Sequence, residues 1–284
     1  MGAMNIYIMT RGRVGTQHTW NALPDSLKEK TFVVCPDNEI EDHYHNSNIG
    51  LSSLISSPNW VKNYSDKFKW LLEMDDGNNK GVIIDDDLRF STPYVRHDGA
   101  HRLCTIGPND SKKPIEEGFQ YMDDLLESTA LVSFHPRQMG HTKEPPYVEN
   151  GKIVCIQGFN RSLIGDIPDL NRFPILADVV LNCTLLSRGI SNKIITTLFI
   201  DWYPCQAPGG CSLTRTPEIQ AEACYWLEER FGPYIKAVIK EPKNEWLGGK
   251  RVDFRGQWKK LYAAGVAGIL DLREGNCTPI KRTR

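Results

Sequence analysis

A membrane-spanning helix needs about 20 consecutive, mostly apolar residues. This sequence contains no such run, although 40% of its 284 residues are hydrophobic. The apolar residues at 6–9 are also too few for the core of a signal peptide. Both absences favour a soluble protein that is not exported.

The eight cysteines include no Cys-x-x-Cys pair; they stand at positions 35, 104, 155, 183, 205, 211, 224 and 277. The spacing therefore indicates neither a zinc knuckle nor a disulfide framework. A reducing cytoplasm is the compartment that fits this pattern best.

Net charge is also nearly absent, at −1, so the overall composition does not favour a polyanionic partner. Basic residues nevertheless gather between Lys236 and Lys260 and again at 281–284. A basic C-terminal third is suited to contacts with phosphates. Charge alone fits a solvated helical face with a frayed tail equally well.

The most informative segment is Gly81–Phe90, in which the apolar residues 82–84 are followed directly by Asp85, Asp86 and Asp87. The β-branched run predicts a buried strand of a mainly parallel sheet, with the carboxylates at its C-terminal end. Ligands bind at that edge of open α/β sheets, and clustered carboxylates favour a hard divalent cation. A solvated acidic turn is the alternative. If the strand continues, Asp85 and Asp87 point to one side and Asp86 to the other.

An α/β alternation surrounds this segment. Strands are expected at 5–9, 31–35 and 82–84, with short helices over 16–30 and a longer one over 64–74. The first strand ends in the basic loop Thr10-Arg11-Gly12-Arg13. Parallel crossovers of this kind place the strand ends at one edge of the sheet.

The second half continues the alternation. Helices are expected over 115–131, over 177–188 with Gly189 as its C-cap, and from Thr216 with Pro217 in the first turn. Strands are expected at 132–134, 152–160 and 194–200, and an irregular loop at 135–151. We therefore predict one α/β domain over residues 4–215 with a helical, basic extension over 216–284 packed on it.

Three pieces in this order resemble a GT-A glycosyltransferase, whose fold is a Rossmann-like, mainly parallel sheet flanked by helices. They are Thr10–Arg13, Asp85–Asp87 and a helix that opens at Asp178. The resemblance implies that the Asp85-x-Asp87 motif holds Mn2+ or Mg2+ and a nucleotide-sugar diphosphate, and that Asp178 is the catalytic base of an inverting enzyme. The usual Glu-Asp pair is Ala177-Asp178 here. A first-turn partner of the helix dipole is the alternative role for Asp178.

A closer resemblance, to phage TET-associated DNA glycosyltransferases, is carried by four motifs: Ile84–Phe90, Gly158–Arg161, Ala207–Ser212, and Arg251-x-Asp253 followed by Gln257–Lys260. It implies transfer of a sugar, most simply from a UDP-sugar, to a hydroxymethylated pyrimidine such as 5-hydroxymethylcytosine in phage DNA. The compartment would then be the cytoplasm of the infected bacterium.

The donor would be held by residues before and within the acidic segment and by a glycine pair; these are Thr10, Arg11, Arg13, Asp85, Asp86, Asp87, Gly209 and Gly210. Plain surface charge is the alternative for the two arginines. A simple tight turn is the alternative for the glycines, which permit positive φ or close approach of a ligand. Asp178, at a helix N-terminus, is expected to have a depressed pKa and to be ionised.

Acceptor contacts are expected from residues with cationic or hydrogen-bonding side chains: His135, Arg137, Arg161, Arg215, Arg251 and Lys259. Trp246 and Trp258 alternate with the cations near the C-terminus, as suits base stacking, although core tryptophans on an amphipathic helix would give the same pattern.

Three other functions stay open on these residues. The same donor chemistry could serve a glycan, lipid or protein acceptor. Carboxylates at a strand end also occur in nucleotidyl- and phosphoryl-transfer enzymes. A non-catalytic DNA-binding module is the remaining class.

Overall fold

The computed structural model describes residues 4–139, 146–202, 209–241, 250–268, 270–271 and 278–279. The strands of its large sheet are β1 (Asn5–Met9), β2 (Thr31–Pro36), β3 (Leu54–Ser57), β4 (Lys80–Asp85), β5 (Leu88–Val95), β6 (His101–Thr105), β7 (Leu131–Pro136), β8 (Tyr147–Glu149), β9 (Ile156–Asn160) and β10 (Asn192–Trp202). The helices are α1 (His18–Ala22), α2 (Asp25–Lys28), α3 (Ile40–Asn46), α4 (Tyr64–Glu73), α5 (Lys113–Leu125), α6 (Arg161–Ile164), α7 (Ala177–Ser187), α8 (Pro217–Phe231) and α9 (Trp258–Val266). Within this part of the chain, no helix has the length and apolar character needed to cross a membrane.

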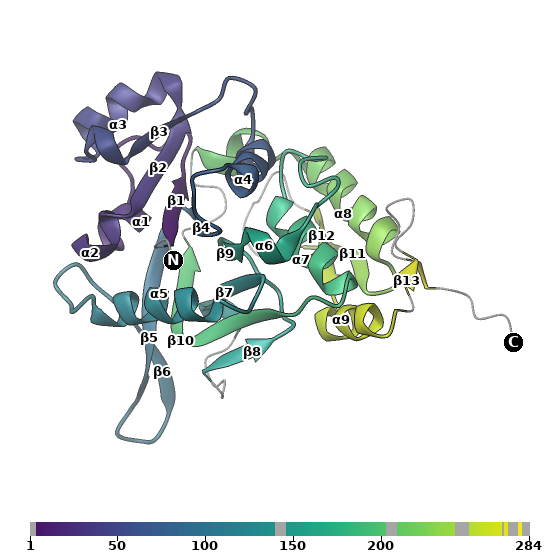
Figure 1. Ribbon diagram of the computed structural model, residues 1–284. Coiled ribbons are helices and arrows are strands. Elements are labelled where there is room, and N and C mark those ends of the chain that lie inside the picture. Colours follow the sequence, from purple (N-terminus) through teal and green to yellow (C-terminus); the bar gives the residue numbers. More distant parts are fainter. Residues whose placement is uncertain are drawn as a thin grey trace, which may run out of the picture.

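The large sheet has the order β3-β2-β1-β4-β9-β7-β10-β5-β6, and β8 pairs with β10. Its pairings make β1, β2, β3, β4, β6, β7 and β10 run in one direction and β5, β8 and β9 in the other. The sheet is therefore mixed but mostly parallel, and helices flank it (Figure 1). The predicted α/β, Rossmann-like class is confirmed.

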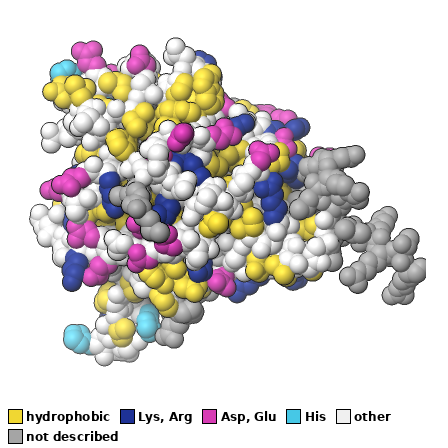
Figure 2. Space-filling model, in the orientation of Figure 1, with side chains coloured by type: hydrophobic (Ala, Val, Ile, Leu, Met, Phe, Trp, Pro, Cys, Tyr) yellow, Lys and Arg dark blue, Asp and Glu magenta, His cyan; other side chains and the backbone are white. Residues whose placement is uncertain are grey.

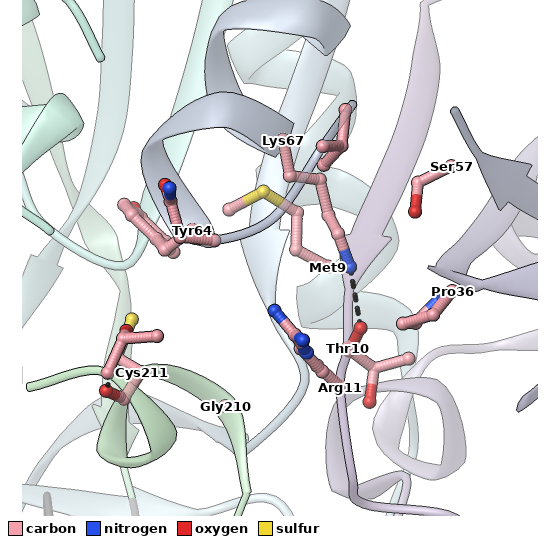
Figure 3. Close-up of a pocket in the computed structure, with 12 residues that line it drawn as sticks. Met9, Thr10, Arg11, Pro36, Ser57, Tyr64, Lys67, Gly210 and Cys211 are labelled. Carbon is pink, nitrogen blue, oxygen red and sulfur yellow. Dashed lines mark hydrogen bonds between the residues drawn. The ribbon is translucent and has the colours of Figure 1, made fainter. Parts of the chain in front are cut away.

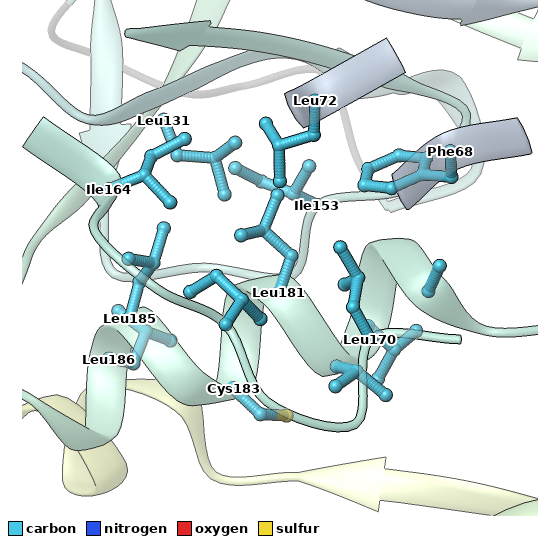
Figure 4. Close-up of a cluster of buried hydrophobic side chains, with 14 of the residues drawn as sticks. Phe68, Leu72, Leu131, Ile153, Ile164, Leu170, Leu181, Cys183, Leu185 and Leu186 are labelled. Atoms are coloured by element: carbon cyan, nitrogen blue, oxygen red, sulfur yellow. The ribbon is translucent and has the colours of Figure 1, made fainter. Parts of the chain in front are cut away.

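Helices cover both faces because alternate strand residues are apolar on both sides. Ile6 and Ile8 of β1 belong to a cluster that also contains residues of α1, α2 and α5. Tyr7 and Met9 belong to a second cluster, built mainly with α4, α7 and α8. Figure 4 shows Leu181 and other side chains of α7 pointing into this second cluster, toward α4.

The same alternation decides where the acidic segment points. Val82 and Ile84 lie on the α5 side of the sheet, and Ile83 lies on the α7 side. Asp85, two residues beyond Ile83, therefore faces α7. Asp85 is the last residue of β4, and Asp86 and Asp87 form a turn into β5. The strand therefore ends at Asp85 and does not continue through Asp87.

Three predicted strands end at one edge of the sheet, as expected. Met9 of β1 is in register with Val34 of β2 and with Asp85 of β4, and both pairings are parallel. The helix predicted over 177–188 is α7, and Gly189 follows it with a φ of 73°. Every residue of α7 is buried, and most of them are apolar, although Asp178, Asn182, Thr184 and Ser187 are polar.

The C-terminal segment is less helical than predicted. Between α8 and α9 the chain forms an antiparallel two-stranded sheet of β11 (Ile235–Lys240) and β12 (Arg251–Gly256), and β13 (Leu270–Asp271) pairs with β14 (Thr278–Pro279). Alternating apolar residues in β11 and β12 pack on α8. The apolar residues therefore repeat with the two-residue period of a strand and not with the period of a helix. Cys224, Leu227 and Phe231 of α8 join the same core cluster as β1 and α7. The boundary at residue 215 stays a prediction.

Candidate active site

A cavity of about 370 Å³ opens where β1 and β4 end and α7 begins. One part of its wall is acidic, with Asp85, Asp86, Asp87 and Asp178, and the rest carries the cations Arg13, Lys152, Arg215, Lys240 and Arg251. Its volume lies within the range of small-molecule sites. Residues from both ends of the sequence thus surround one space that holds charge of both signs.

Asp85, at the end of β4, is a half-buried carboxylate of this cavity, whereas Asp86 and Asp178 are buried. Its amide donates to the carbonyl of Cys155 at 2.9 Å, and the Cys155 thiol contacts its side chain. Burial raises the pKa of Asp85 well above its usual value, and the charges of Asp87, Asp178 and Asp86 add to the effect. These charges act on Asp85 because all four carboxylates line the same cavity.

Arg13 clamps the other two acidic residues of the turn. Its Nη1 lies 2.5 Å from Oδ1 of Asp86 and 2.8 Å from Oδ2 of Asp87. Asp86 is only 2% exposed, and its Oδ2 has no hydrogen-bond partner among the described residues. Asp86 and Asp87 therefore share one partner, and the alternation expected for a continuing strand does not apply to them, because β4 ends at Asp85. The pKa of Asp87 is still raised, by burial and by Asp86, against the lowering effect of Arg13.

Asp178 lies in the first turn of α7 and is 9% exposed. Leu176, immediately before the helix, has a left-handed φ of 69°, and Cys155 across the cavity has a φ of 64°. Non-glycine residues in this conformation store strain, which is often found at functional sites.

The predicted depression of the Asp178 pKa is wrong. Burial raises that pKa, and it outweighs the backbone N–H of Val179 and the charges of Lys152 and Arg215, which lower it. The N-terminus of α7 lowers the pKa of Asp178 as expected, but desolvation raises the same pKa by more.

Asp85 and Asp87 fit a divalent cation. Within the described ranges, no group of three or more His, Cys, Asp or Glu side chains could form a metal site from protein alone. Mg2+, however, is usually bound by one or two carboxylates together with substrate phosphates and water. Both residues line the large cavity, the charge of Asp87 raises the pKa of Asp85, and a cation would relieve this repulsion.

A second, smaller cavity of about 40 Å³ adjoins the first and shares Met9, Tyr64, Gly210 and Cys211 with it. Figure 3 shows Arg11, Lys67 and Tyr64 around this space. Lys67 is buried, and its Nζ donates to the carbonyls of Thr10 at 2.7 Å and Val34 at 3.1 Å. Burial lowers the pKa of Lys67 to about 8.

Of the predicted donor residues, Thr10 and Arg11 line this small cavity, whereas Arg13 lines the large one. The Thr10 hydroxyl accepts from Nε2 of Gln17 at 2.9 Å, and Arg11 donates to the carbonyl of Lys62. The β1–α1 loop that carries all three is thus tied to its neighbours on both sides.

Gly209 and Gly210 pack against that loop. Both have positive φ, 88° and 61°, as anticipated for this pair. The amide of Gly210 donates to the carbonyl of Arg11 at 2.7 Å. A Cβ on Gly209 would stand 2.6 Å from Cγ of Arg13, so the close approach that requires glycine is to the protein itself.

Arg215 and Arg251 line the large cavity, but two other predicted acceptor residues do not. His135 is buried in β7, where its Nδ1 lies 2.9 Å from the carbonyl of Pro136. Arg137 donates to Oγ1 of Thr105 at 2.8 Å. The His135 contact lies within β7 and the Arg137 bond goes to β6, so the structure places both side chains away from the cavity, and their acceptor role stays a prediction.

Arg161 and Lys259 also lie outside the cavity. Arg161 donates to the carbonyls of Leu72 at 2.9 Å and Leu71 at 3.0 Å, and it pairs with Asp76 at 2.8 Å. It therefore caps the C-terminus of α4. Lys259 is exposed on α9 and is not among the residues around the cavity. His141, Ala207, Pro208 and Trp246 lie outside the described residues.

The sequence did not indicate several residues that line the cavity; the main ones are Tyr64, Lys152, Cys155, Lys240 and Asp253. Lys152 opens a predicted strand and Tyr64 a predicted helix, positions at which local pattern says nothing about function. The positive φ of Cys155 has no signal in the sequence, because it follows from how β9 enters the sheet.

Figure 2 shows that side chains of both charge signs are interspersed on one face of the molecule. No protein-family model matches this sequence, and no curated protein matches it. The geometry of the cavity and the resemblance of its motifs are therefore what support a function.

Proposed function

We propose that this protein is a metal-dependent, inverting glycosyltransferase that uses a nucleotide sugar. The observation that carries the proposal is a single cavity in which the acidic turn after β4, the first turn of α7 and a cationic wall meet. Glycosyl transfer needs stabilisation of the leaving diphosphate and removal of a proton from the acceptor hydroxyl. The cavity offers separate groups for these two tasks.

The donor would lie in the large cavity, because the small one, at about 40 Å³, has room for little more than a water-sized group. Arg13 and Gly210 line the large cavity, and Tyr64 lies between the two spaces. Asp85 and Asp87 would hold Mn2+ or Mg2+, which, when bound, neutralises charge on the leaving diphosphate. UDP is the proposed nucleotide, on the resemblance alone.

Asp178 is the proposed general base. It lies on the wall of the same cavity as Asp85, and the charges of Lys152 and Arg215 favour its ionised form. A carboxylate with a raised pKa is a stronger base than an exposed one, provided that it is ionised at the working pH. It would accept the proton of the acceptor hydroxyl during attack on the sugar.

The proposed acceptor is a hydroxymethylated pyrimidine in phage DNA, modified in the cytoplasm of the infected host. This acceptor is proposed from the resemblance. Arg215 and Arg251 support it because they place cations in the same cavity as Asp178, the proposed general base. Asp253 pairs with Arg251 at 3.4 Å and limits its reach.

Incubation with UDP-sugars, Mn2+ and a hydroxymethylated oligonucleotide, followed by mass spectrometry, tests the proposal. A hexose or pentose increment on the modified base, with release of UDP, is the expected result. Transfer of the sugar only to a saccharide, lipid or protein would show that the proposed DNA acceptor is wrong. Release of pyrophosphate with nucleotide attachment would instead indicate nucleotidyl transfer, and binding without any product a non-catalytic module.

A further inference from the structure

The β11–β12 ribbon carries an unusual set of cations. Its register pairs Lys236 with Arg255 and Lys240 with Arg251. Directly opposed residues of antiparallel strands share a face, and so do alternate residues of one strand. All four cations therefore lie on one face of the ribbon, which we call the ribbon face.

Folding alone does not favour this arrangement. Like charges directly opposite each other destabilise a sheet. Asp253 lies between the two cation pairs and reduces the repulsion within only one of them. Its Oδ2 lies 2.6 Å from Nζ of Lys240 and 3.4 Å from Nη2 of Arg251. Lys236 and Arg255 are exposed, and neither has an ion-pair partner in the part of the chain that the structure describes.

The ribbon face leads from the candidate active site outward. Lys240 and Arg251 line the large cavity, whereas Lys236 and Arg255 do not. The two pairs are four residues apart along each strand, or about 14 Å at about 3.4 Å per residue. That length spans about four phosphates of a stacked strand, which carries one charge per 3.4 Å.

We propose that the ribbon face binds the phosphodiester backbone of a single nucleic-acid strand and guides it into the cavity. The inference rests on the proposed function, since the strand would carry the acceptor base. A cavity of about 370 Å³ admits a nucleotide-sized group and not a duplex. The face has only Val238 as an apolar member, too little to insert into a membrane surface.

The test is the salt dependence of binding to an unmodified oligothymidylate, without donor, measured by fluorescence anisotropy. Each phosphate contact on a single strand contributes about 0.7 to the slope of log affinity against log salt. Lys236→Ala combined with Arg255→Ala is expected to lower that slope by about 1.4. A matched control removes one exposed lysine and one exposed arginine elsewhere, Lys113→Ala with Arg96→Ala, and should leave the slope nearly unchanged.

An equal slope for the ribbon variant and the wild type overturns the proposal. So does tighter binding to a duplex of the same length, or equal binding to phosphatidylserine–phosphatidylcholine vesicles. The thermal midpoint of the variant should not fall, because the substitutions relieve repulsion. A variant that loses both affinity and folding is replaced by Lys236→Gln with Arg255→Gln, which must reproduce the slope change.

Two results separate this inference from the proposed function. If no acceptor is glycosylated but the slope changes as expected, the proposed function fails and the ribbon face stands. If transfer occurs and the slope is unchanged, the ribbon face fails. Where transfer occurs, the variant should raise KM for an oligonucleotide and leave KM for a hydroxymethylated nucleoside unchanged.

Discussion

Asp85, Asp87 and Asp178 are held in one buried cavity, where each has a raised pKa. A carboxyl group whose pKa is raised by folding stabilises the fold while it is protonated, and this contribution is lost as the pH rises through the raised pKa. At neutral pH the unliganded protein therefore carries an unfavourable electrostatic term at this site. Such a term is expected where a cationic ligand is to be bound.

Replacement of Asp85 should show this electrostatic cost. Asp85→Asn is expected to raise the free energy of unfolding at pH 7, on the order of 1 kcal/mol, because it removes a buried charge. The gain should shrink as the pH falls below neutral, since the wild-type group then becomes protonated. Urea unfolding across pH measures this, and donor binding with Mn2+ should be lost. A marked destabilisation at pH 7 would contradict the raised pKa.

The proposed base makes a separate prediction. Asp178→Asn should leave donor affinity nearly unchanged and lower turnover by about 10²- to 10⁴-fold. In the wild type, turnover should fall on the acidic side at a pH above the ordinary titration of aspartate, because the active form is ionised and its pKa is raised. A pH profile of kcat for both proteins gives the measurement. Unchanged turnover in the variant would assign the base elsewhere.

At the scale of elements, the loop between β1 and α1 is positioned by segments that are distant in sequence. Arg13 reaches the turn after β4, and Gly210 donates to Arg11 from the start of a 3-10 turn at 210–213. The glycine pair therefore connects the donor side of the cavity to the second half of the chain. The two glycines therefore hold the loop in place through contacts within the protein. The sequence pattern alone could not distinguish this role from contact with a ligand.

Gly209→Ala tests this connection. The added Cβ would clash with Arg13 and with the carbonyl of Arg11, at 2.6 and 2.8 Å, so we expect a loss of about 1–3 kcal/mol and a higher KM for the donor. Gly77→Ala is the matched control: Gly77 also has a positive φ, 76°, but nothing lies within 4 Å of its Cβ position. Equal effects of the two substitutions on KM would mean that φ strain, and not the contact with the loop, is responsible.

For the whole molecule, a ligand that binds only the folded state raises the free energy of unfolding by mass action, about 2.7 kcal/mol at 100 times its Kd. Mn2+ with a nucleoside diphosphate should therefore raise the thermal midpoint, and a chelator should reverse the shift. Asp87→Ala is expected to abolish this response. Differential scanning fluorimetry makes the comparison, and a full response in the variant would remove Asp87 from the proposed metal site.

Local patterns were enough to predict much of the fold. The apolar run before Asp85, the Gly189 C-cap after α7 and the Thr216-Pro217 start of α8 are all contained in a few neighbouring residues. They indicated the α/β class, the shared edge of the parallel strands and the first-turn position of Asp178. Turn chemistry and periodicity are local properties, so one sequence suffices for them.

What the sequence could not determine is which side chains meet. Arg137 and Arg161 donate hydrogen bonds to segments beside them, His135 contacts the next residue of its own strand, and none of the three lines the cavity.

The sequence by itself therefore determined the layered fold and the acidic end of β4. Only the tertiary structure decided that Asp178 and Asp85 line one cavity, that burial outweighs the helix N-terminus in setting the pKa of Asp178, and that four cations line one face of the β11–β12 ribbon. The physical reason is that periodicity acts over a few residues, whereas desolvation and charge interactions depend on segments brought together from distant parts of the chain.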